Sequence, residues 1–153
     1  MRRRGFEIVN DKFLEDVIKE DIFLPKRATH NSAGYDFFLP RNINIKPKES
    51  ISIKTYIKAY MENDEVLLIF IRSSIGVKKN LVLKNITGVI DSDYYNNKDN
   101  DGNIIINLIN NGNEEVSLLQ HERFVQGIFV KYLKVDDEEF PNKKRLGGFG
   151  STV

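Results

Sequence analysis

The sequence contains no cysteine and only two histidines, His30 and His121. Without thiols the chain can form no disulfide bond, no cysteine nucleophile and no thiolate metal site. A Ser-His-Asp group would need one of the two histidines as its base, and a zinc site built from several histidines lacks ligands. Carboxylates are therefore the groups left to carry out acid–base chemistry.

An excess of charge of one sign is also absent. Lysine and arginine number 23 and aspartate and glutamate 22, so the formal net charge is +1. No overall field attracts nucleic acid or a membrane surface, and any polyanion must be bound locally. No apolar run is long enough to span a bilayer, and the basic start MRRRGFEIV is not followed by the apolar segment of a secretion signal. We expect no nucleic-acid or membrane partner and a cytoplasmic protein, in the host cytoplasm if its source is viral.

The sequence indicates one β-rich domain. Its 153 residues, 41% of them hydrophobic, are enough for one globular domain with a core and too few for two. Short apolar or alternating runs separated by Asn, Asp and Gly are typical of an all-β sandwich, jelly roll or barrel. We expect a domain over residues 1–140 and a tail over 141–153. The predicted strands are 6–9, 43–47, 50–54, 56–61, 66–71, 81–83, 104–109, 116–119 and 124–133.

One short helix is predicted after the first strand. Asn10 or Asp11 could cap it, and Pro25 would end it. Its apolar face would consist of Phe13, Leu14, Val17 and Ile18.

The stretch NITGVIDSDYY, residues 85–95, is a candidate active-site hairpin. Val89 and Ile90 favour a strand, and Gly88 would let a ligand approach the backbone closely. Asp91 stands where the apolar run stops, so its carboxylate can act on a bound substrate. A strand that ends in a polar turn would explain the same residues without any ligand.

Two further segments place small and polar residues at strand ends. In SAGYDFF, residues 32–38, Asp36 is an isolated acid among aromatic residues, which is also typical of a structural turn. In RSSIG, residues 72–76, two hydroxyl side chains follow Arg72, and this set of donors suits a phosphate or a carboxylate. A solvated loop is the other interpretation of RSSIG.

The last two clusters lie near the C-terminus. In HERFVQG, residues 121–127, the polar side chains are interpreted more simply as those of a strand edge. RLGGFGSTV, residues 145–153, combines glycines, hydroxyls and Arg145, which expose N–H groups and positive charge to anions. Phe149 would bury little surface in such a tail, so we expect it to stack on a planar ligand over which the tail closes. An untethered terminus could have the same composition.

Taken together, the five clusters resemble the trimeric dUTP diphosphatase (dUTPase) family. AGYD, RSSIG, GVIDSDYY, ERFVQ and RLGGFGST occur in the order and at roughly the separations of the five family motifs, from Ala33 to Thr152. The resemblance implies a β jelly roll, assembled as a homotrimer with active sites at the subunit interfaces. It also implies hydrolysis of dUTP to dUMP and pyrophosphate with Mg²⁺ as cofactor, and a flexible closing arm over residues 141–153.

By position, the resemblance assigns the nucleoside to the central hairpin. Asp91 would be the catalytic acid that activates the attacking water, and Tyr94 would pack under the deoxyribose. Uracil would be recognised at Asn85, Gly88 and Ile90, largely through backbone groups.

The resemblance assigns the phosphates to the other motifs. Phosphate oxygens would be bound at RSSIG by Arg72, Ser73 and Ser74. Metal-bound water would be held by Asp36 and Gln126, and Gln126 would also border the substrate. The closing arm would contribute Arg145, Phe149, Gly150, Ser151 and Thr152.

Some positions depart from the family pattern. The chain runs YYNNKDNDGN after the motif, so its hairpin tip is longer and the residues that border the sugar are less well defined. His121 and Val153 stand where glycines are common, and we expect both to be tolerated. A closing arm tethered by DDEEFPNKK, residues 136–144, would reach a neighbouring subunit's site more easily than its own.

Two alternatives remain beside dUTP hydrolysis. dCTP deaminase resembles the same family but has a glutamate on the strand after the hairpin, where this chain has Asn107 in GNIIINL. A catalytically silent nucleotide-sensing or interaction trimer would need neither Asp36 nor Asp91 nor the glycine-rich tail.

Overall fold

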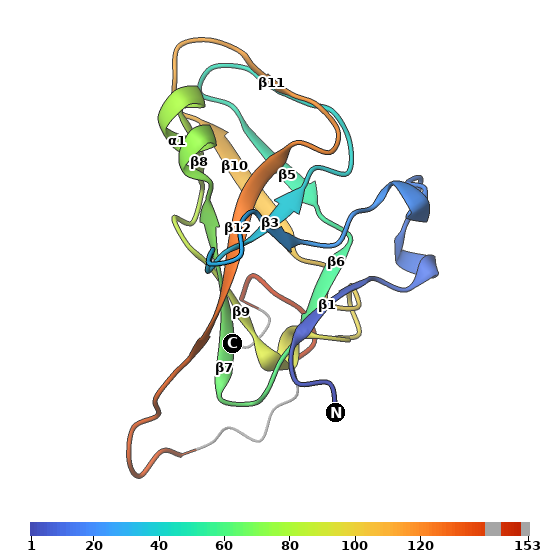
Figure 1. Cartoon of the computed structure of the whole chain (residues 1–153), viewed down its shortest axis with the longest axis vertical. Coiled ribbons are helices and arrows are strands. Elements are labelled where there is room, and N and C mark those ends of the chain that lie inside the picture. Colours follow the sequence, from blue (N-terminus) through green and yellow to red (C-terminus); the bar gives the residue numbers. More distant parts are fainter. Residues whose placement is uncertain (140–144, 151–153) are drawn as a thin grey trace.

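Antiparallel strands make up most of the fold (Figure 1). A computed structural model describes residues 1–139 and 145–150 of the chain. Besides the strands, this part contains the helix α1 (Ser73–Lys79) and the 3-10 helices Asp11–Phe13, Lys19–Asp21 and Ser92–Tyr94. The strands are β1 (Gly5–Ile8), β2 (Lys26–Arg27), β3 (Tyr35–Phe38), β4 (Ile43–Ile45), β5 (Ser50–Lys54), β6 (Ile57–Tyr60), β7 (Glu65–Ile71), β8 (Leu81–Leu83), β9 (Gly88–Asp91), β10 (Ile105–Asn110), β11 (Val116–Leu118) and β12 (Arg123–Lys131).

Within the described residues the strands form one large sheet and three smaller ones. The large sheet has the order β2-β3-β12-β7-β9, and a three-stranded sheet has the order β5-β10-β8. β1 pairs with β6, β11 pairs with β4, and every pairing is antiparallel. This architecture confirms the expected all-β, jelly-roll-like fold.

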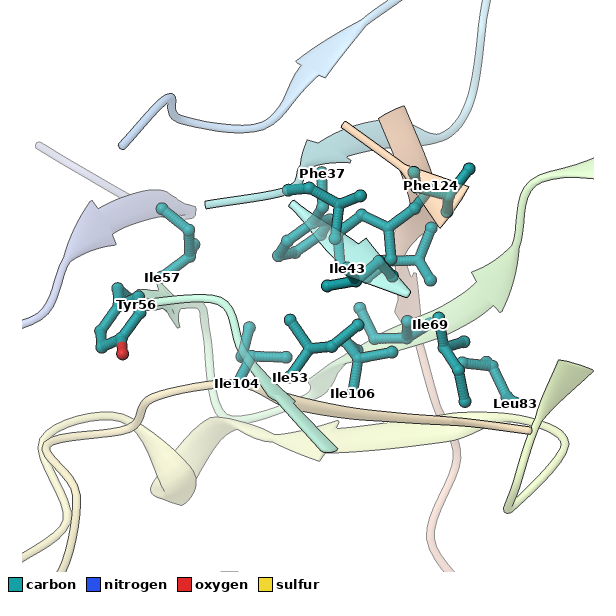
Figure 2. Close-up of a cluster of buried hydrophobic side chains, with 14 of the residues drawn as sticks. Phe37, Ile43, Ile53, Tyr56, Ile57, Ile69, Leu83, Ile104, Ile106 and Phe124 are labelled. Atoms are coloured by element: carbon teal, nitrogen blue, oxygen red, sulfur yellow. The ribbon is translucent and has the colours of Figure 1, made fainter. Parts of the chain in front are cut away.

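The hydrophobic core lies between the two larger sheets. Figure 2 shows Phe37 of β3 and Phe124 of β12 on one side, and Ile53 of β5 and Ile106 of β10 opposite them together with Ile69 of β7. All five side chains are at most 4% exposed. Because β10 alternates strictly, its core face is buried while its opposite face is only half-buried. That second face is left to line a site.

The helix predicted after Asn10 is wrong. The segment forms only the short 3-10 helices Asp11–Phe13 and Lys19–Asp21. Glu15 has a φ of 56°, a left-handed conformation that an α-helix cannot continue through. Leu14 is 7% exposed whereas Ile18 is 61% exposed, so the apolar residues do not share one buried face.

The RSSIG segment, expected as a loop, instead begins the helix α1. Arg72 is its N-cap residue, Ile75 is its buried side chain, and Asn80 ends it in the left-handed conformation. A Cβ on Gly76 would lie 3.2 Å from Ile71 Cγ2, so this glycine lets the helix turn back closely on the end of β7. No helix in residues 1–139 and 145–150 is long and apolar enough to cross a membrane.

Candidate active site

A cavity of about 290 Å³ opens where the edge strand β9 faces β8 and β10. Its lining combines apolar side chains with a few polar and charged groups. The predicted residues Asn85, Gly88, Ile90, Asp91, Tyr94, Arg145 and Phe149 all line it, together with Ile69, Leu83, Thr87, Val89, Ile105, Ile106, Asn107 and Gly148. The structure therefore brings the central hairpin and the C-terminal arm together at one place.

One edge of the strand β9 borders this cavity and has no strand partner among the described residues. β9 is the last strand in the order of the large sheet, so only its β7 side is paired in the described sheet. The other edge carries N–H and C=O groups that can bind a ligand as a strand partner would. Gly88 also has a packing role, because a Cβ there would lie 3.0 Å from the Ile69 Cβ on the neighbouring strand.

The turn that leads into β9 is strained. Ile86 has a φ of 68°, a conformation that β-branched residues rarely adopt, and the Thr87 N–H donates to the Asn85 carbonyl oxygen over 2.7 Å. This tight turn sets Asn85 and Thr87 at the mouth of the cavity.

Asp91 ends β9 with a carboxylate that remains accessible. Its side chain is 48% exposed, and the Arg145 guanidinium contacts its Oδ2. The Arg145 Nε donates over 2.6 Å to the Asp93 carboxylate, which is 62% exposed. One guanidinium thus bridges two acids, and an anionic ligand could compete with them for it.

Tyr94 forms a fixed wall of the cavity. The side chain is 6% exposed, and its hydroxyl donates to the Asn103 carbonyl oxygen over 2.7 Å. The Asn100 amide donates to the same hydroxyl over 2.8 Å. Burial raises the pKa of Tyr94, which keeps the phenol protonated and able to donate.

The described part of the arm lies on the cavity of its own chain. Besides the contacts of Arg145, the Asp99 N–H donates to the Leu146 carbonyl oxygen over 3.1 Å. Figure 1 shows this red segment beside the yellow turn that follows β9. The arm was expected to reach a neighbour's site more easily, but a single chain already offers it these partners. Phe149 lines the cavity and is exposed, Gly150 is exposed but does not line it, and Ser151 and Thr152 lie outside the described residues.

A second group of predicted residues lies around Asp36, which is 4% exposed. The Asp36 Oδ1 is 3.2 Å from the Arg72 Nε, and its Oδ2 is 3.2 Å from an Arg123 Nη1. Gln126 lies opposite Asp36 in the β3–β12 register, and its Oε1 would be 2.2 Å from a Cβ on Gly34. We call Arg72, Arg123 and Asp36 the arginine cluster. Ser73 and Ser74 follow it at the start of α1.

Asp91 and the arginine cluster lie at opposite ends of β7, and the cavity extends from Asp91 to Ile69 in the second half of the strand. Asp91 is beside Val66 in the β7–β9 register, and Arg72 follows six residues after Val66. At about 3.3 Å per residue, these positions are about 20 Å apart along the strand. Figure 1 shows α1 at one end of β7 and the turn after β9 near the other. One chain therefore does not bring all predicted site residues together.

Sequence reasoning missed several residues that shape these regions. Arg123 was interpreted as a strand-edge residue, and no local pattern marks it because its partner Asp36 lies 87 positions away. Asn107 was named only for its contrast with the deaminase glutamate, yet it lines the cavity. Asn100 was not singled out, because no feature of the sequence distinguishes it from the neighbouring asparagines. Neither histidine lines the cavity, and His121 instead stacks on Phe23 with ring centroids 4.0 Å apart.

Comparison with known proteins identifies the family. The dUTPase family model matches residues 20–153. The deoxyuridine 5'-triphosphate nucleotidohydrolase of Lactococcus lactis is 46% identical over 153 residues, which cover 99% of each chain. The chain belongs to the dUTPase family. A second dUTPase relative, from Shewanella amazonensis, is 33% identical over 146 residues and covers 91% of this chain and 92% of its own.

Solved dUTPase structures have the same fold. The dUTPase of Streptococcus mutans superposes with a TM-score of 0.76 at 42% identity, over 86% of this chain and 98% of its own. A mutant dUTPase from phage phi11 of S. aureus, described with a structural Mg(II) ion, gives a TM-score of 0.71 at 19% identity, over 93% of this chain and 99% of its own. The dUTPase family is thus compatible with a divalent metal.

Proposed function

We propose that this chain hydrolyses dUTP to dUMP and pyrophosphate, with the nucleoside bound in the cavity beside β9. The observation that carries the proposal is an edge strand with free backbone groups that ends in an accessible carboxylate and is covered by a glycine-rich arm. Uracil has donors and acceptors on one edge, which an unpaired strand edge can match. A cavity of about 290 Å³ suits a nucleoside and leaves the phosphates at its rim.

Asp91 is the general base in this proposal. Its carboxylate is half-exposed at the rim, where a water molecule could lie between it and the phosphates. When a triphosphate enters, its negative oxygens compete for the Arg145 guanidinium. Release of that contact frees Asp91 to accept a proton from the attacking water, while Arg145 stabilises the charge that develops on the phosphate.

Tyr94 is the wall that selects deoxyribose. Its ring is buried, and its hydroxyl is held by two hydrogen bonds, so it cannot move aside for a larger sugar at little cost. A ribose 2′-hydroxyl against this wall would meet a steric barrier and lose its hydrogen bonds to water.

The phosphates require the arginine cluster, and we infer that a neighbouring subunit supplies it. The cluster of the same chain is about 20 Å from Asp91 along β7. Large apolar side chains remain exposed on the segment between the two regions, namely Val77 at 80%, Ile86 at 84% and Val89 at 60%. Exposed apolar surface of this kind is typical of an interface. A homotrimer, the assembly that the family resemblance implies, would place Arg72, Ser73 and Ser74 of one subunit against the cavity of the next.

Magnesium dependence is part of the proposal, and the metal-water role expected of Gln126 stays a prediction, whereas the surroundings of Asp36 favour another role. Both Asp36 oxygens face guanidinium groups, so the carboxylate offers little to a cation. Mg²⁺ keeps several waters and commonly binds through substrate phosphates, whose charge it neutralises. We therefore assign Asp36 to holding Arg72 and Arg123 in place.

Another acidic group, outside the cavity, is already compensated. Ligand atoms of Glu62, Asp64 and Glu65 lie within 4.8 Å of one another. Arg4 pairs with Glu62 and Glu65, and Lys131 pairs with Asp64. The Arg4 hydrogen bonds hold the pKa of Glu65 below its usual value. We propose no metal there.

Deamination of dCTP is disfavoured by the residue at the cavity wall. Asn107 lines the cavity where that reaction would require a glutamate, and an amide cannot transfer the proton. A silent sensor is disfavoured by the accessible Asp91 carboxylate.

The test is to incubate the purified protein with dUTP, dCTP, dTTP and UTP, each with Mg²⁺ and with EDTA, and to identify the products. We expect pyrophosphate and dUMP from dUTP with Mg²⁺, and little from the other nucleotides. Ammonia released from dCTP would support the deaminase, and binding of dUTP without turnover would support the silent sensor.

A further inference from the structure

The hairpin tip, residues 95–102, turns inward onto the fold. Its side chains Asn97 and Asp101 and the next residue Asn103 are 6%, 8% and 4% exposed. In the described residues, buried side-chain polar atoms all have hydrogen-bond partners. The additional residues of this longer hairpin tip are therefore packed and hydrogen-bonded within the fold.

The base of this tip is fixed to two other parts of the fold. The Lys58 Nζ of β6 donates over 2.9 Å to Asp101 Oδ2 and over 2.6 Å to Asn96 Oδ1. The Asn10 N–H donates to the same Asp101 oxygen over 2.7 Å. A buried ion pair with additional hydrogen bonds holds a fixed geometry, so the tip is a firm support.

Asn100 links this support to the sugar wall. Its Oδ1 accepts from the Asn97 amide over 2.8 Å and from the Gly102 N–H over 3.1 Å. These bonds orient the amide so that its Nδ2 donates to the Tyr94 hydroxyl over 2.8 Å. Both ends of one amide are used, one to close the turn and the other to hold the phenol.

The same tip receives the closing arm. The Asp99 N–H donates to the Leu146 carbonyl oxygen, and a Cβ on Gly147 would lie 2.4 Å from Asp99 Oδ2. A Cβ on Gly148 would lie 3.2 Å from the Tyr94 ring. The arm thus packs between the tip and the wall, and the position of the ring decides how closely the arm can lie.

We propose that Asn100 is a positioning residue that sets the selectivity for deoxyribose by holding the Tyr94 ring between the sugar and the arm. The inference rests on the proposed function, in which Tyr94 is the sugar wall. Asn100 itself does not line the cavity, and its contact with the cavity lining is the hydrogen bond to the Tyr94 hydroxyl; the same Nδ2 also donates weakly, over 3.5 Å, to the Asn103 carbonyl oxygen.

The experiment is a double-mutant cycle on the ratio of kcat/KM for dUTP to kcat/KM for UTP. Asn100→Asp keeps the oxygen that closes the turn and removes the donor to Tyr94, while Tyr94→Phe keeps the ring and removes the hydroxyl. The added charge should weaken both nucleotides alike, so it cancels in the ratio. We expect Asn100→Asp to lower the ratio about 3- to 10-fold, as for one lost hydrogen bond. In the Tyr94→Phe background the same substitution should change the ratio less than about 1.5-fold.

The matched control is Asn113→Asp, which adds the same charge in an exposed turn away from the cavity and should leave the ratio unchanged. Folding is checked by the melting curve, and if Asn100→Asp does not fold, Asn100→Ser and Tyr94→Phe must each lower the ratio. A wild-type ratio in the folded Asn100 variant, or effects that add in the double mutant, overturns the inference. A wild-type protein that turns over UTP as well as dUTP instead refutes the proposed sugar wall.

Discussion

The cavity and the arginine cluster differ in shape and in charge. The cavity is concave with a largely apolar lining, and its one cation, Arg145, pairs with Asp91 of the lining and with Asp93 just outside it, a balance of −1 for the three. The arginine cluster carries Arg72 and Arg123 against Asp36, a balance of +1, and none of these three residues lines the cavity. The cavity therefore offers a hollow without excess positive charge, and the arginine cluster offers positive charge outside the cavity.

This difference explains how a nucleotide could be divided between them. The planar base and the sugar suit an apolar hollow with an unpaired strand edge, and the triphosphate suits a surface with excess positive charge. Since the two regions of one chain are separated along β7, only assembly would bring unlike regions together. A substitution or deletion in one region should therefore reduce only the contribution of that region to turnover.

The largest effect is expected from the acid of the cavity. Asp91→Asn keeps the size of the side chain but cannot take the proton from water, so kcat should fall about 10²- to 10⁴-fold while nucleotide binding remains. Steady-state kinetics and binding of a non-hydrolysable dUTP analogue measure the two quantities. Asp93→Asn is the matched control, because Asp93 contacts Arg145 but does not line the cavity. A nearly normal kcat in Asp91→Asn would remove this residue from the chemistry.

The next effect should come from the arm. Deleting residues 145–153 should lower kcat/KM about 100-fold or more, because the arm excludes water and positions the phosphates. The melting temperature should change little, since Phe149 is 72% exposed and Leu146 is 50% exposed. Arg145 and Leu146 already contact the cavity side of the fold, but fixing each residue costs about 1–2 kcal/mol, so base and phosphates together should be needed to hold the arm firmly closed.

Protease sensitivity of the tail tests this closure. A non-hydrolysable dUTP analogue should protect it and dUMP should not. Within the arm, Phe149→Ala should impair turnover, whereas Leu146→Ala should not, because Leu146 contributes its carbonyl oxygen to Asp99. Normal turnover by the truncated chain, or equal protection by dUMP, would contradict the closing arm.

The sequence predicted which residues line the cavity better than it predicted where the other motifs lie relative to them. Strands such as β8 and β10 could be predicted because their apolar patterns are local, and the acid at the end of β9 followed from the same patterns. α1 was missed because seven residues with one buried side chain leave no helical periodicity. The helix after Asn10 was wrong because a single left-handed residue, Glu15, overrides the apolar spacing. Long-range pairs such as Asp36 and Arg123 have no local signature at all.

His121, which stands where glycine is common in the family, also depends on contacts that the local sequence does not reveal. His121 has a φ of 69°, which explains why glycine is common at this position. Here the strain is accompanied by stacking on Phe23 and by a 2.8 Å hydrogen bond between His121 Nε2 and the Asp21 carbonyl oxygen. Neither compensation can be read from the histidine alone.

A smaller effect is expected at the sugar wall. Tyr94→Ala opens the space beside the sugar, so the preference for dUTP over UTP should narrow by about 1–3 kcal/mol in kcat/KM. The ratio is independent of the folded fraction, which the loss of a buried ring will reduce. Tyr95→Phe is the control, because Tyr95 donates to Glu7 and lies outside the cavity. If the ratio of kcat/KM for dUTP to that for UTP is unchanged in Tyr94→Ala, a group other than Tyr94 excludes the 2′-hydroxyl.

The smallest effect is the most direct test of the two-region arrangement. Asp91→Asn damages only the cavity and Arg72→Ala only the arginine cluster, so each variant alone should be nearly inactive. If a site combines the cavity of one subunit with the cluster of the next, co-refolding the two variants in equal amounts makes about a quarter of the sites intact. Activity should then return to about a quarter of the wild-type value. If each chain used its own cluster, no site would be intact and the mixture would stay inactive.

The matched control mixes wild type with the double variant Asp91→Asn/Arg72→Ala. If sites are shared between subunits, this mixture should again have about a quarter of the wild-type activity, whereas sites within one chain would give about half of it. Light scattering on the same samples reports the mass, and a monomer that retains full activity would reject assembly altogether. The two mixtures contain the same substitutions in different arrangements, so any difference between them arises from which chain carries each region. Equal activity in both mixtures is the result expected when the cavity and the arginine cluster meet only across an interface.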